Sequence, residues 1–366
     1  MSDQSILVVN KYCWGHEKTG GSETYLKEIF TRFPEDCEIT LVCGRHLSED
    51  RVTADRVSIE QPASDRLPGV LGLLNIYLIC TLYTYYRLYL DSFDAVVTVN
   101  TPLPWIVFTR VPKISIVHHL ALGSFFETHP FPLDWLGYAA QRCSIYVSKY
   151  GRIVTVSKSS AQTLIENGVS PDKITIIKNG INIGDYEPGT KRDNPSILFL
   201  GGLETYKGAD RLPEIHTKAE ALYGESIRLD IAGRDGGVSD QISRYCSNTP
   251  SAHFHGFVSE SEKQRLLEQA WLLLLPSRVE GYGIVAIEAN DCATPVVGTD
   301  VKGLRNSIKH EQTGLLITED TSKIANAVVD LLSDKSYRVA LGSQGRQWAE
   351  EHSWKIAANQ FNKLVT

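Results

Sequence analysis

Residues 275–298 read LPSRVEGYGIVAIEANDCATPVVG, and the prediction of the fold starts from this stretch. A buried apolar run closes at Leu275, where Pro and Ser stop it. A helical pattern begins at Ile284 and ends before the apolar pair Val296-Val297, which begins another strand. The stretch is therefore predicted to be a strand end, a loop, a helix, a turn and a strand.

Two glutamates bracket the start of the predicted helix. Glu280 stands on the loop beside Gly281 and Gly283, which let a ligand approach the backbone closely. Glu288 lies one turn beyond Ile284 on the same helical face. Because the free N–H groups of a helix N-terminus favour an anion, a ligand with a phosphate between two hydroxylated rings suits this layout. Two solvated surface charges are the alternative interpretation.

The complete sequence of this stretch is a more specific signal than the spacing of its two glutamates alone. Glu280 and Glu288 are separated by seven residues, with Gly-Tyr-Gly after the first glutamate and Pro-Val-Val after the helix. This resembles the retaining glycosyltransferases of the GT-B fold, the large family 4 or group 1 class. The resemblance implies an α/β chain with two doubly wound Rossmann-like domains that face each other across a cleft. It also implies that Glu280 contacts the transferred sugar and that Glu288 holds the ribose of the nucleotide.

Composition and charge agree with such a protein. The 366 residues predict two domains, and 42% hydrophobic with 22% charged residues is typical of a globular protein. A net charge of −6 argues against a general nucleic-acid binder, which needs a basic face. Seven cysteines without a CxxC pattern, and a chain that enters a strand at Ser5, predict a cytoplasmic protein with reduced thiols and no leader.

The first predicted strand, 5–9, leads to a glycine pair. Gly20 and Gly21 precede an amphipathic helix from about Ser22 to Phe33, with Ser22 as its N-cap. This pair resembles the family's first glycine-rich loop, which faces the phosphates of the donor. An ordinary loop is the alternative.

The strand 113–117 ends at His118 and His119. A residue at the carboxyl end of a parallel strand points into the ligand crevice of such folds. The family commonly has His-Asp here, so the resemblance puts His118 near the reacting sugar and His119 on the aspartate position. A purely structural role of His118 is the alternative.

A second strand is predicted at 38–43, and a polar stretch follows as far as Asp65. Residues 67–90, LPGVLGLLNIYLICTLYTYYRLYL, are then apolar and rich in tyrosine. Their length approaches that of a membrane span, but Asn75, Arg87 and the tyrosines dilute the apolarity. A buried or dimer-forming helix, a membrane-surface contact that receives a lipid-linked acceptor, and a true span are the alternatives.

A polar segment with Pro and Gly at 185–195 marks the domain boundary. The next loop resembles the family's Gly-Arg-Leu followed by Lys-Gly, whose Arg and Lys clamp the diphosphate. Lys207 is present, but Gly202 occupies the arginine position. Lys302 and Arg278 are candidates for the missing cation.

The resemblance implies two further features of the second half. The backbone of the turn Gly256-Phe257 reads the base in relatives. The last helix, containing Trp348 and Trp354, returns to the first domain. The expected domains are therefore 1–185 on the acceptor side, 186–347 for the nucleotide-sugar donor, and a returning helix at 348–366.

The predicted activity is transfer of a hexosyl group from a UDP-, GDP- or ADP-sugar to a hydroxyl acceptor, with retention of configuration. The expected catalytic residues are Glu280, His118 and Lys207. The donor is expected to contact a larger set: Gly20, Gly21, Gly202, Gly256, Phe257, Gly281, Tyr282, Gly283, Ile284 and Glu288. No metal is obligatory in the family, since Lys207 and the helix N-terminus at Gly283 and Ile284 hold the diphosphate.

The expected partners are the nucleotide sugar and a glycan acceptor, which a lipid can carry, in the cytoplasm or on the inner face of the membrane. Two other functions remain open. One is a nucleotide-sugar epimerase of related fold, against which the two glutamates and Lys207 argue. The other is a non-catalytic nucleotide-sugar-binding regulator, which Gly202 and Asn306 keep open because both depart from the family pattern.

Overall fold

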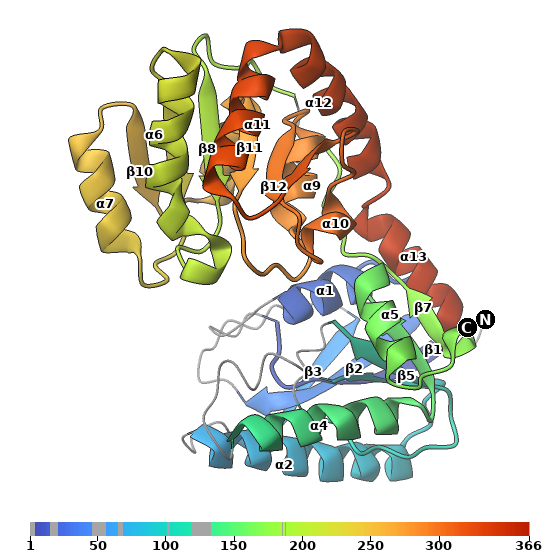
Figure 1. Cartoon of the computed structure of the whole chain (residues 1–366). Helices are drawn as coiled ribbons and strands as arrows, with labels where there is room; N and C mark the ends of the chain where they lie inside the picture. Colours follow the sequence, from blue (N-terminus) through green and yellow to red (C-terminus); the bar gives the residue numbers. More distant parts are fainter. Residues whose placement is uncertain are drawn as a thin grey trace. The chain divides into compact units, whose positions relative to one another are not determined.

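The structure is a computed structural model, and it describes residues 4–14, 21–45, 56–64, 69–100, 103–118, 133–184, 186 and 188–365. The chain divides into two compact units (Figure 1). The first unit comprises the residues up to Asn179 together with those from Trp354 onward, and the second unit comprises Gly180–Ser353.

Within the described residues, the first unit is a parallel sheet with the strand order β3-β2-β1-β4-β5-β6-β7. Its strands are β1 (Gln4–Val9), β2 (Cys37–Arg45), β3 (Val57–Ser64), β4 (Ala95–Val99), β5 (Lys113–Val117), β6 (Arg152–Thr155) and β7 (Ile174–Ile176). Its helices are α1 (Gly21–Phe30), α2 (Gly69–Leu90), α4 (Leu133–Ser148), α5 (Lys158–Glu166), the short η1 (Pro171–Lys173) and α13 (Trp354–Val365). Parallel neighbours require crossover connections, and α1, α2, α4 and α5 lie in the connections β1–β2, β3–β4, β5–β6 and β6–β7.

The second unit is a parallel sheet with the order β10-β9-β8-β11-β12-β13. Its strands are β8 (Ser196–Leu200), β9 (Arg228–Ala232), β10 (Ala252–Gly256), β11 (Leu272–Leu275), β12 (Val296–Thr299) and β13 (Gly314–Ile317). Its helices are η2 (Thr205–Lys207), η3 (Ala209–Arg211), α6 (Leu212–Tyr223), α7 (Ser239–Asn248), α8 (Glu260–Gln269), α9 (Ile284–Asp291), α10 (Leu304–Ser307), α11 (Thr321–Ser333) and α12 (Lys335–Glu350). Two doubly wound sheets confirm the predicted α/β class.

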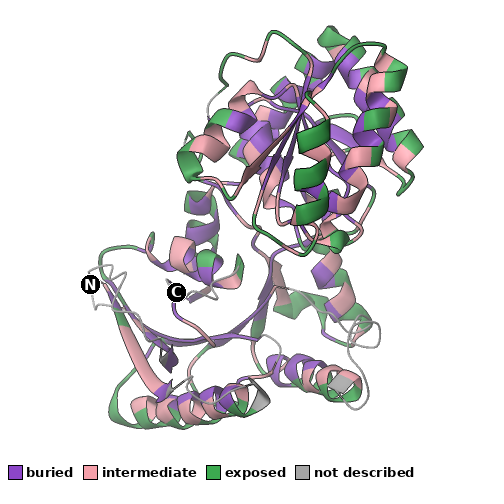
Figure 2. Cartoon of the chain, turned by 90° about the vertical axis from the view of Figure 1, so that its left-hand side faces the viewer, coloured by how far each residue is buried: buried purple, intermediate pink, exposed green. Residues whose placement is uncertain are grey.

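Both sheets are buried between helices, as Figure 2 shows. The strand Leu272–Leu275 consists of four buried leucines, and Ala95–Val99 and Lys113–Val117 are buried throughout. Near-continuous apolar strands are expected where helices cover both faces of a parallel sheet. The prediction of a buried strand that ends at Leu275 is therefore confirmed.

Three details differ from the sequence prediction. The polar stretch through Asp65 contains the strand β3, which lies at the edge of the sheet and tolerates Pro62 and polar residues there. Ser22 is the second residue of α1 rather than its N-cap, and its hydroxyl donates to Glu23. Trp348 and Trp354 do not share one helix, because α12 ends at Glu350.

Candidate functional site

The second sheet has a topological switch point between β8 and β11. From β8 the chain winds through β9 to β10 on one side, and it then returns to place β11, β12 and β13 on the other. The loops that follow β8 and β11 consequently leave the carboxyl edge in opposite directions. In open parallel sheets this point forms a ligand crevice.

The two loops at the switch point are joined by an ion pair. The Nζ of Lys207, after β8, lies 2.7 Å from Oε1 of Glu280, after β11. The same carboxylate accepts hydrogen bonds from the N–H of Gly281 at 3.2 Å and from Oγ of Ser277 at 3.3 Å. The structure therefore brings together Lys207 and Glu280, which lie 73 residues apart in the sequence.

Glycines let the backbones of these loops touch. Gly208 has φ +74°, and a Cβ there would lie 2.0 Å from the carbonyl oxygen of Pro276. A Cβ on Gly303 would lie 2.0 Å from the carbonyl oxygen of Glu280. Since backbone cannot move aside as a side chain can, these two positions require glycine. The Lys207-Gly208 pair is thus fixed by packing, and Glu280 is held from two sides.

The loop before α9 combines an open glycine with a strained one. A Cβ on Gly281 would meet nothing within 4 Å, whereas one on Gly283 would lie 2.6 Å from Leu304. Gly283 caps α9 with φ +79°, a conformation that favours glycine. The ring of Tyr282 is buried in a cluster with Ile287 and others, so it anchors the loop. Ile284 begins the helix.

Glu288 lies on α9 and points to a different pair of partners. Its Oε1 is 3.0 Å from Nζ of Lys263 on α8 and 3.4 Å from the hydroxyl of Tyr186. Burial raises the pKa of Glu288, while the ammonium of Lys263 works against this shift. Sequence reasoning missed Lys263 and Tyr186, because neither lies near Glu288 in the chain and neither belongs to a motif.

The missing cation at Gly202 has a new candidate. Arg278 forms two hydrogen bonds with the carboxylate of Asp210, at 2.7 and 2.8 Å, so its charge is already neutralised. By contrast, Arg234 follows β9 and is exposed, and its carbonyl accepts a hydrogen bond from the N–H of Leu203 at 2.9 Å. The backbone of Arg234 therefore lies directly beside Gly202. Lys302 is exposed on the loop after β12.

The guanidinium of Arg234 lies over the ring of Phe257, with 4.8 Å between its Cζ and the ring centroid. Phe257 is 68% exposed and follows Gly256, whose φ is +65°. An arginine over an aromatic face is a favourable cation–π arrangement. The loops after β8, β9 and β10 thus gather Gly202, Arg234 and Phe257 along one edge.

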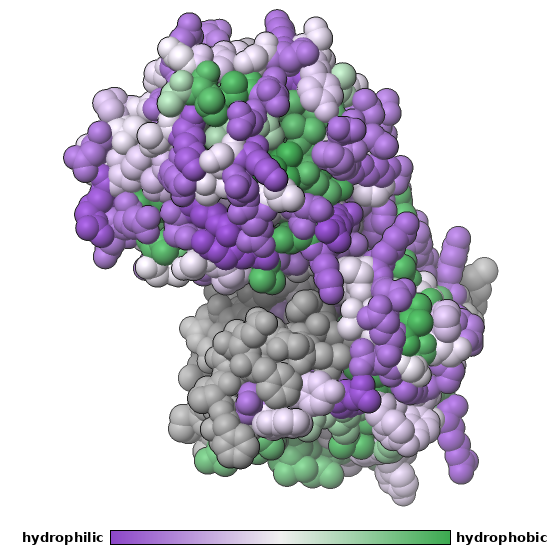
Figure 3. All heavy atoms as spheres, viewed as in Figure 1, coloured by the Kyte–Doolittle hydropathy of each residue, from purple (hydrophilic) through white to green (hydrophobic). Residues whose placement is uncertain are grey.

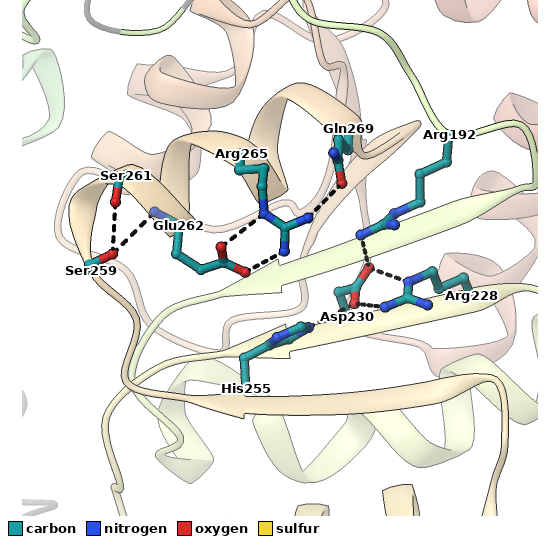
Figure 4. Close-up of polar contacts among 9 residues, drawn as sticks. All are labelled: Arg192, Arg228, Asp230, His255, Ser259, Ser261, Glu262, Arg265 and Gln269. Carbon is teal, nitrogen blue, oxygen red and sulfur yellow. Dashed lines mark hydrogen bonds and ion pairs between the residues drawn. The ribbon is translucent and has the colours of Figure 1, made fainter.

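A buried carboxylate anchors the strand that carries Gly256. Asp230 on β9 accepts hydrogen bonds from Nε2 of His255 at 2.8 Å and from the guanidinium of Arg228 at 2.8 and 2.9 Å, and Arg192 lies 3.3 Å away (Figure 4). Burial alone would raise the pKa of Asp230, but these donors hold it well below its ordinary value. His255 is thereby fixed immediately before the Gly256-Phe257 turn.

In the first unit, His118 directly follows β5. Its ring packs edge-on against Tyr25 with 4.9 Å between centroids. Burial lowers the pKa of His118 to about 4, although Glu23 raises it, so the imidazole is neutral at pH 7. Among the described residues, its Nε2 is buried without a hydrogen-bond partner.

The remaining predicted residues of the first unit are only partly described. Gly21 is the first residue of α1, and a Cβ there would meet nothing within 4 Å. Gly20 and His119 lie outside the described residues. Within the described ranges, no cluster of three or more His, Cys, Asp or Glu side chains could hold a metal ion, and no helix is long and apolar enough to cross a membrane.

Comparison with known proteins identifies the class. The family model of the group 1 glycosyl transferases matches residues 186–348, and that of glycosyltransferase family 4 matches residues 19–185. An uncharacterised glycosyltransferase of Methanocaldococcus jannaschii is 31% identical over 271 residues, which cover 69% of this chain and 68% of that protein. These matches define an enzyme of the glycosyltransferase class. Within it, the chain belongs to glycosyltransferase family 4, with a group 1 domain in its second half.

Two further proteins are similar to this chain. The D-inositol 3-phosphate glycosyltransferase of Corynebacterium aurimucosum is 28% identical over 236 residues, 58% of this chain and 56% of that protein. The chain thus matches little more than half the length of that enzyme. The structure of HepE from Anabaena, in complex with UDP and glucose, shares the fold with a TM-score of 0.71, 16% identity and 99% coverage of both chains.

Proposed function

We propose that the protein is a retaining hexosyltransferase that uses a nucleotide-diphospho-sugar and transfers its sugar to a hydroxyl of a glycan or glycolipid acceptor. The observation that carries this proposal is the Lys207–Glu280 pair at the switch point of the second sheet. This is where a parallel α/β sheet binds its ligand, and the pair offers both a cation for phosphate and a carboxylate for sugar hydroxyls.

Lys207 can hold Glu280 and a phosphate oxygen together, because an ammonium has three N–H donors. The diphosphate oxygens then lie near the N-terminus of α9, where the N–H groups of Gly283 and Ile284 and the helix dipole add positive potential. This arrangement supports departure of the nucleoside diphosphate without a metal ion. Stabilising the developing charge on the leaving group is the main task of such a site.

Glu280 is proposed to bind sugar hydroxyls rather than to attack the anomeric carbon. Its carboxylate already accepts hydrogen bonds from Lys207, Ser277 and Gly281, so both of its oxygens are engaged. Retention by a double displacement would need a free carboxylate at the anomeric carbon. Attack from the face of the leaving phosphate fits the arrangement better. The neutral His118 then hydrogen-bonds the reacting sugar through Nε2.

Arg234 is proposed to supply the second cation for the diphosphate. Lys207 and Glu280 balance each other's charge, so Lys207 alone leaves most of the charge of the diphosphate unmatched. Arg234 lies on the neighbouring loop beside Gly202 and has a solvent-exposed guanidinium. Its fork of N–H donors is suited to two phosphate oxygens. The backbone of Gly256 and Phe257 next to it is proposed to contact the base.

The acceptor and the cellular place are part of the same proposal. HepE was solved with UDP and glucose, and the Corynebacterium relative is named for glycosyl transfer to an inositol phosphate. Both support a nucleotide-sugar donor and a polyhydroxylated acceptor. We propose a cytoplasmic enzyme that works at the inner face of the membrane. A non-catalytic nucleotide-sugar-binding protein is the alternative, favoured by the absence of the family arginine at Gly202.

The test is a transfer assay with UDP-, GDP- and ADP-hexoses and a mixture of glycan and glycolipid acceptors. Release of nucleoside diphosphate and the anomeric configuration of the product are measured together, the latter by NMR. The proposal expects a product with the donor's configuration and its loss in Glu280→Gln. An inverted product would refute retention. Donor binding without transfer to any acceptor would favour the regulatory alternative, and an epimerised donor would indicate the epimerase.

A further inference from the structure

Helix α2 of the first unit exposes an apolar face to solvent. Its inner side is fixed to the sheet, where the ring of Tyr77 stacks on that of Trp105 at 4.3 Å. Its outer side carries leucines and tyrosines at helical spacing, with Leu78 60% and Tyr89 87% exposed. The outer stripe, here named the α2 stripe, consists of Leu71, Leu74, Leu78, Leu82, Tyr85, Tyr86, Tyr89 and Leu90.

No charge interrupts the α2 stripe. The single charged residue of the helix is Arg87, which is tied to Glu60 and Asp91. A helix that faces water ordinarily carries polar residues on its outer side, and one that is apolar all round is covered on both sides. Figure 3 shows hydrophobic atoms along the lower edge of the molecule, where Figure 1 has α2. The stripe is therefore a surface that needs a partner.

The stripe continues into an aromatic ridge. The hydroxyl of Tyr85 donates to the carbonyl oxygen of Ile106 and accepts from the N–H of Phe108. Phe108 packs edge-on against Tyr150, and the hydroxyl of Tyr150 is 2.9 Å from that of Tyr146 at the end of α4. All five of these side chains are more than one-third exposed. A bonded, exposed ridge thus connects α2 with α4.

A basic hollow of about 1120 Å³ begins at this ridge, with Phe108 and Tyr150 among its lining residues. It lies at the amino edge of the first sheet, and its charged residues are six cations and one acid: Arg110, Lys113, Lys149, Arg152, Lys173, Lys363 and Asp172. Such a concentration of positive charge contrasts with the net charge of −6 of the chain. Within the described residues, no ion pair neutralises these cations.

Two hydrogen bonds fix part of this hollow. Lys113 is 7% exposed and donates to the carbonyl oxygen of Val107 at 2.9 Å, and burial lowers its pKa to about 8. Lys173 donates to the carbonyl oxygen of Lys149 at 2.8 Å. These two bonds fix two of the lysines of the hollow, while Arg110, Arg152 and Lys363 are exposed and place their charge in solvent.

We propose that this face of the first unit binds an anionic lipid bilayer. The α2 stripe enters the interface between headgroups and acyl chains, the tyrosines of the ridge lie at headgroup depth, and the basic hollow receives lipid phosphates. Charge selects this partner, because an anionic surface complements the hollow, whereas a second copy of the chain would bring the same cations. The inference does not depend on the transfer reaction, and it is tested without it.

The experiment is co-sedimentation of the full chain with vesicles of phosphatidylcholine alone and of phosphatidylcholine mixed with phosphatidylglycerol. We expect binding to the mixed vesicles, a decrease with added salt, and weak binding to the neutral ones. The variant Lys149→Glu/Arg152→Glu/Lys363→Glu should weaken binding to anionic vesicles by more than a hundredfold, since each cation near such a surface contributes about fivefold. Leu78→Gln/Leu82→Gln should weaken binding to both kinds of vesicle.

The matched control is Arg244→Glu/Lys323→Glu/Lys335→Glu, which makes the same charge change on exposed residues of the second unit. Its affinity for anionic vesicles should stay within about threefold of that of the parent chain, because salt screens charges that lie far from the bound surface. If both triple variants lost binding to anionic vesicles equally, the net charge of the chain would explain the effect and the proposal would be overturned.

Analytical ultracentrifugation separates the remaining alternative. A chain that binds neither kind of vesicle, but forms a dimer that Leu78→Gln/Leu82→Gln dissociates, would identify the α2 stripe as a contact between copies and overturn the proposal. Unchanged circular dichroism and melting temperature of each variant show that the fold is intact. The substituted positions are exposed, apart from the partly buried Lys149, and none of them belongs to the buried core.

Discussion

The two units use the same parallel-sheet plan, but the carboxyl-edge loops of the second unit and the outer face of α2 in the first unit carry opposite kinds of side chain. In the second unit, the carboxyl-edge loops are joined by paired charges, with Lys207 to Glu280 and Arg278 to Asp210. The first unit instead leaves uncharged leucines and tyrosines of α2 in solvent. Charged groups held in fixed positions suit a ligand with a constant diphosphate group. An apolar surface suits a partner whose contacting atoms have no fixed arrangement, such as a lipid surface.

The two units differ in which residues can be substituted while the unit stays folded. The ion pairs of the second unit position loops, so losing one partner leaves a half-buried charge uncompensated. The hydroxyl of Tyr85 in the α2 stripe is bonded to Ile106 and Phe108, whereas the leucines of the stripe are at least half exposed and available for binding. We therefore expect substitutions in the second unit to affect catalysis and stability, and substitutions of the α2 stripe's leucines to affect neither in solution.

The largest effect is expected at the Lys207–Glu280 pair. Glu280→Gln keeps the shape but removes the charge that pairs with Lys207 and that we propose to bind the sugar, so kcat should fall about 10²–10³-fold. The donor KM should change by a much smaller factor, because the nucleotide contacts remain. Steady-state kinetics with saturating acceptor measures the two separately. Full activity in this variant would exclude Glu280 from the site.

A stability effect of about 3 kcal/mol is expected from Asp230→Asn, which leaves Arg228 and Arg192 near an uncharged amide. The pKa of Asp230 lies below its unfolded value near 3.8, so its contribution is present at neutral pH and is lost as the pH falls below about 4. Urea unfolding at pH 7 and at pH 3 should therefore show a smaller difference between variant and parent at pH 3 than at pH 7, because the loss is progressive and is complete only below the depressed pKa of Asp230. An equal difference at both pH values would contradict the charge network.

Glu288→Gln should weaken nucleotide binding by about 10- to 100-fold, the usual value of a charge-assisted hydrogen bond of about 1.5–3 kcal/mol. Isothermal titration with the nucleoside diphosphate measures this, and Glu260→Gln is the control because Glu260 is exposed and contacts the same Lys263. If only the control weakens binding, the ribose contact is not at Glu288.

Arg234→Ala should raise the KM for the donor about tenfold, since one exposed charge-assisted contact to the diphosphate is lost. Arg234→Lys should recover part of this loss because it keeps the charge without the fork of donors. Arg244→Ala, on the exposed side of α7, should leave KM unchanged. Equal KM values for Arg234→Ala and the parent would exclude Arg234 as the second cation and leave Lys302 as the candidate.

The smallest effect is expected from Leu78→Gln in the α2 stripe. An exposed leucine contributes little to the fold, so the free energy of unfolding should change by less than about 0.5 kcal/mol. The buried Leu274 gives the contrast, because Leu274→Ala should cost about 2–5 kcal/mol. Urea titrations of both variants compare the two surfaces directly. A large loss in Leu78→Gln would mean that the stripe packs inside the unit.

Much of the fold was predictable because the decisive residues are close in sequence. The apolar strand before Glu280, the glycines after it and the Lys207-Gly208 pair each follow from local rules of burial and backbone freedom. The edge strand β3 was not predictable by these rules, since an edge position removes the need for a continuous apolar run. Ser22 was misread as an N-cap because a serine before a helical pattern also occurs inside the first turn.

The partners of the site residues were beyond sequence reasoning. Lys263 and Tyr186 reach Glu288 from separate elements, and Arg234 lies beside Gly202 only because β9 pairs with β8. Such contacts depend on the register of the sheet and not on spacing along the chain. The resemblance supplied the expected roles of Glu280 and Glu288, while the structure supplied what holds each of them.

The most direct test of the central claim is donor binding to the second unit's switch point. Thermal and urea unfolding of the parent chain and of Lys207→Met are measured with UDP-, GDP- and ADP-sugars. A donor at about a hundred times its Kd should stabilise the parent by about 2.7 kcal/mol, and the variant by much less. If no nucleotide sugar stabilises the parent, or if Lys207→Met is stabilised equally by the preferred donor, the diphosphate does not bind at Lys207.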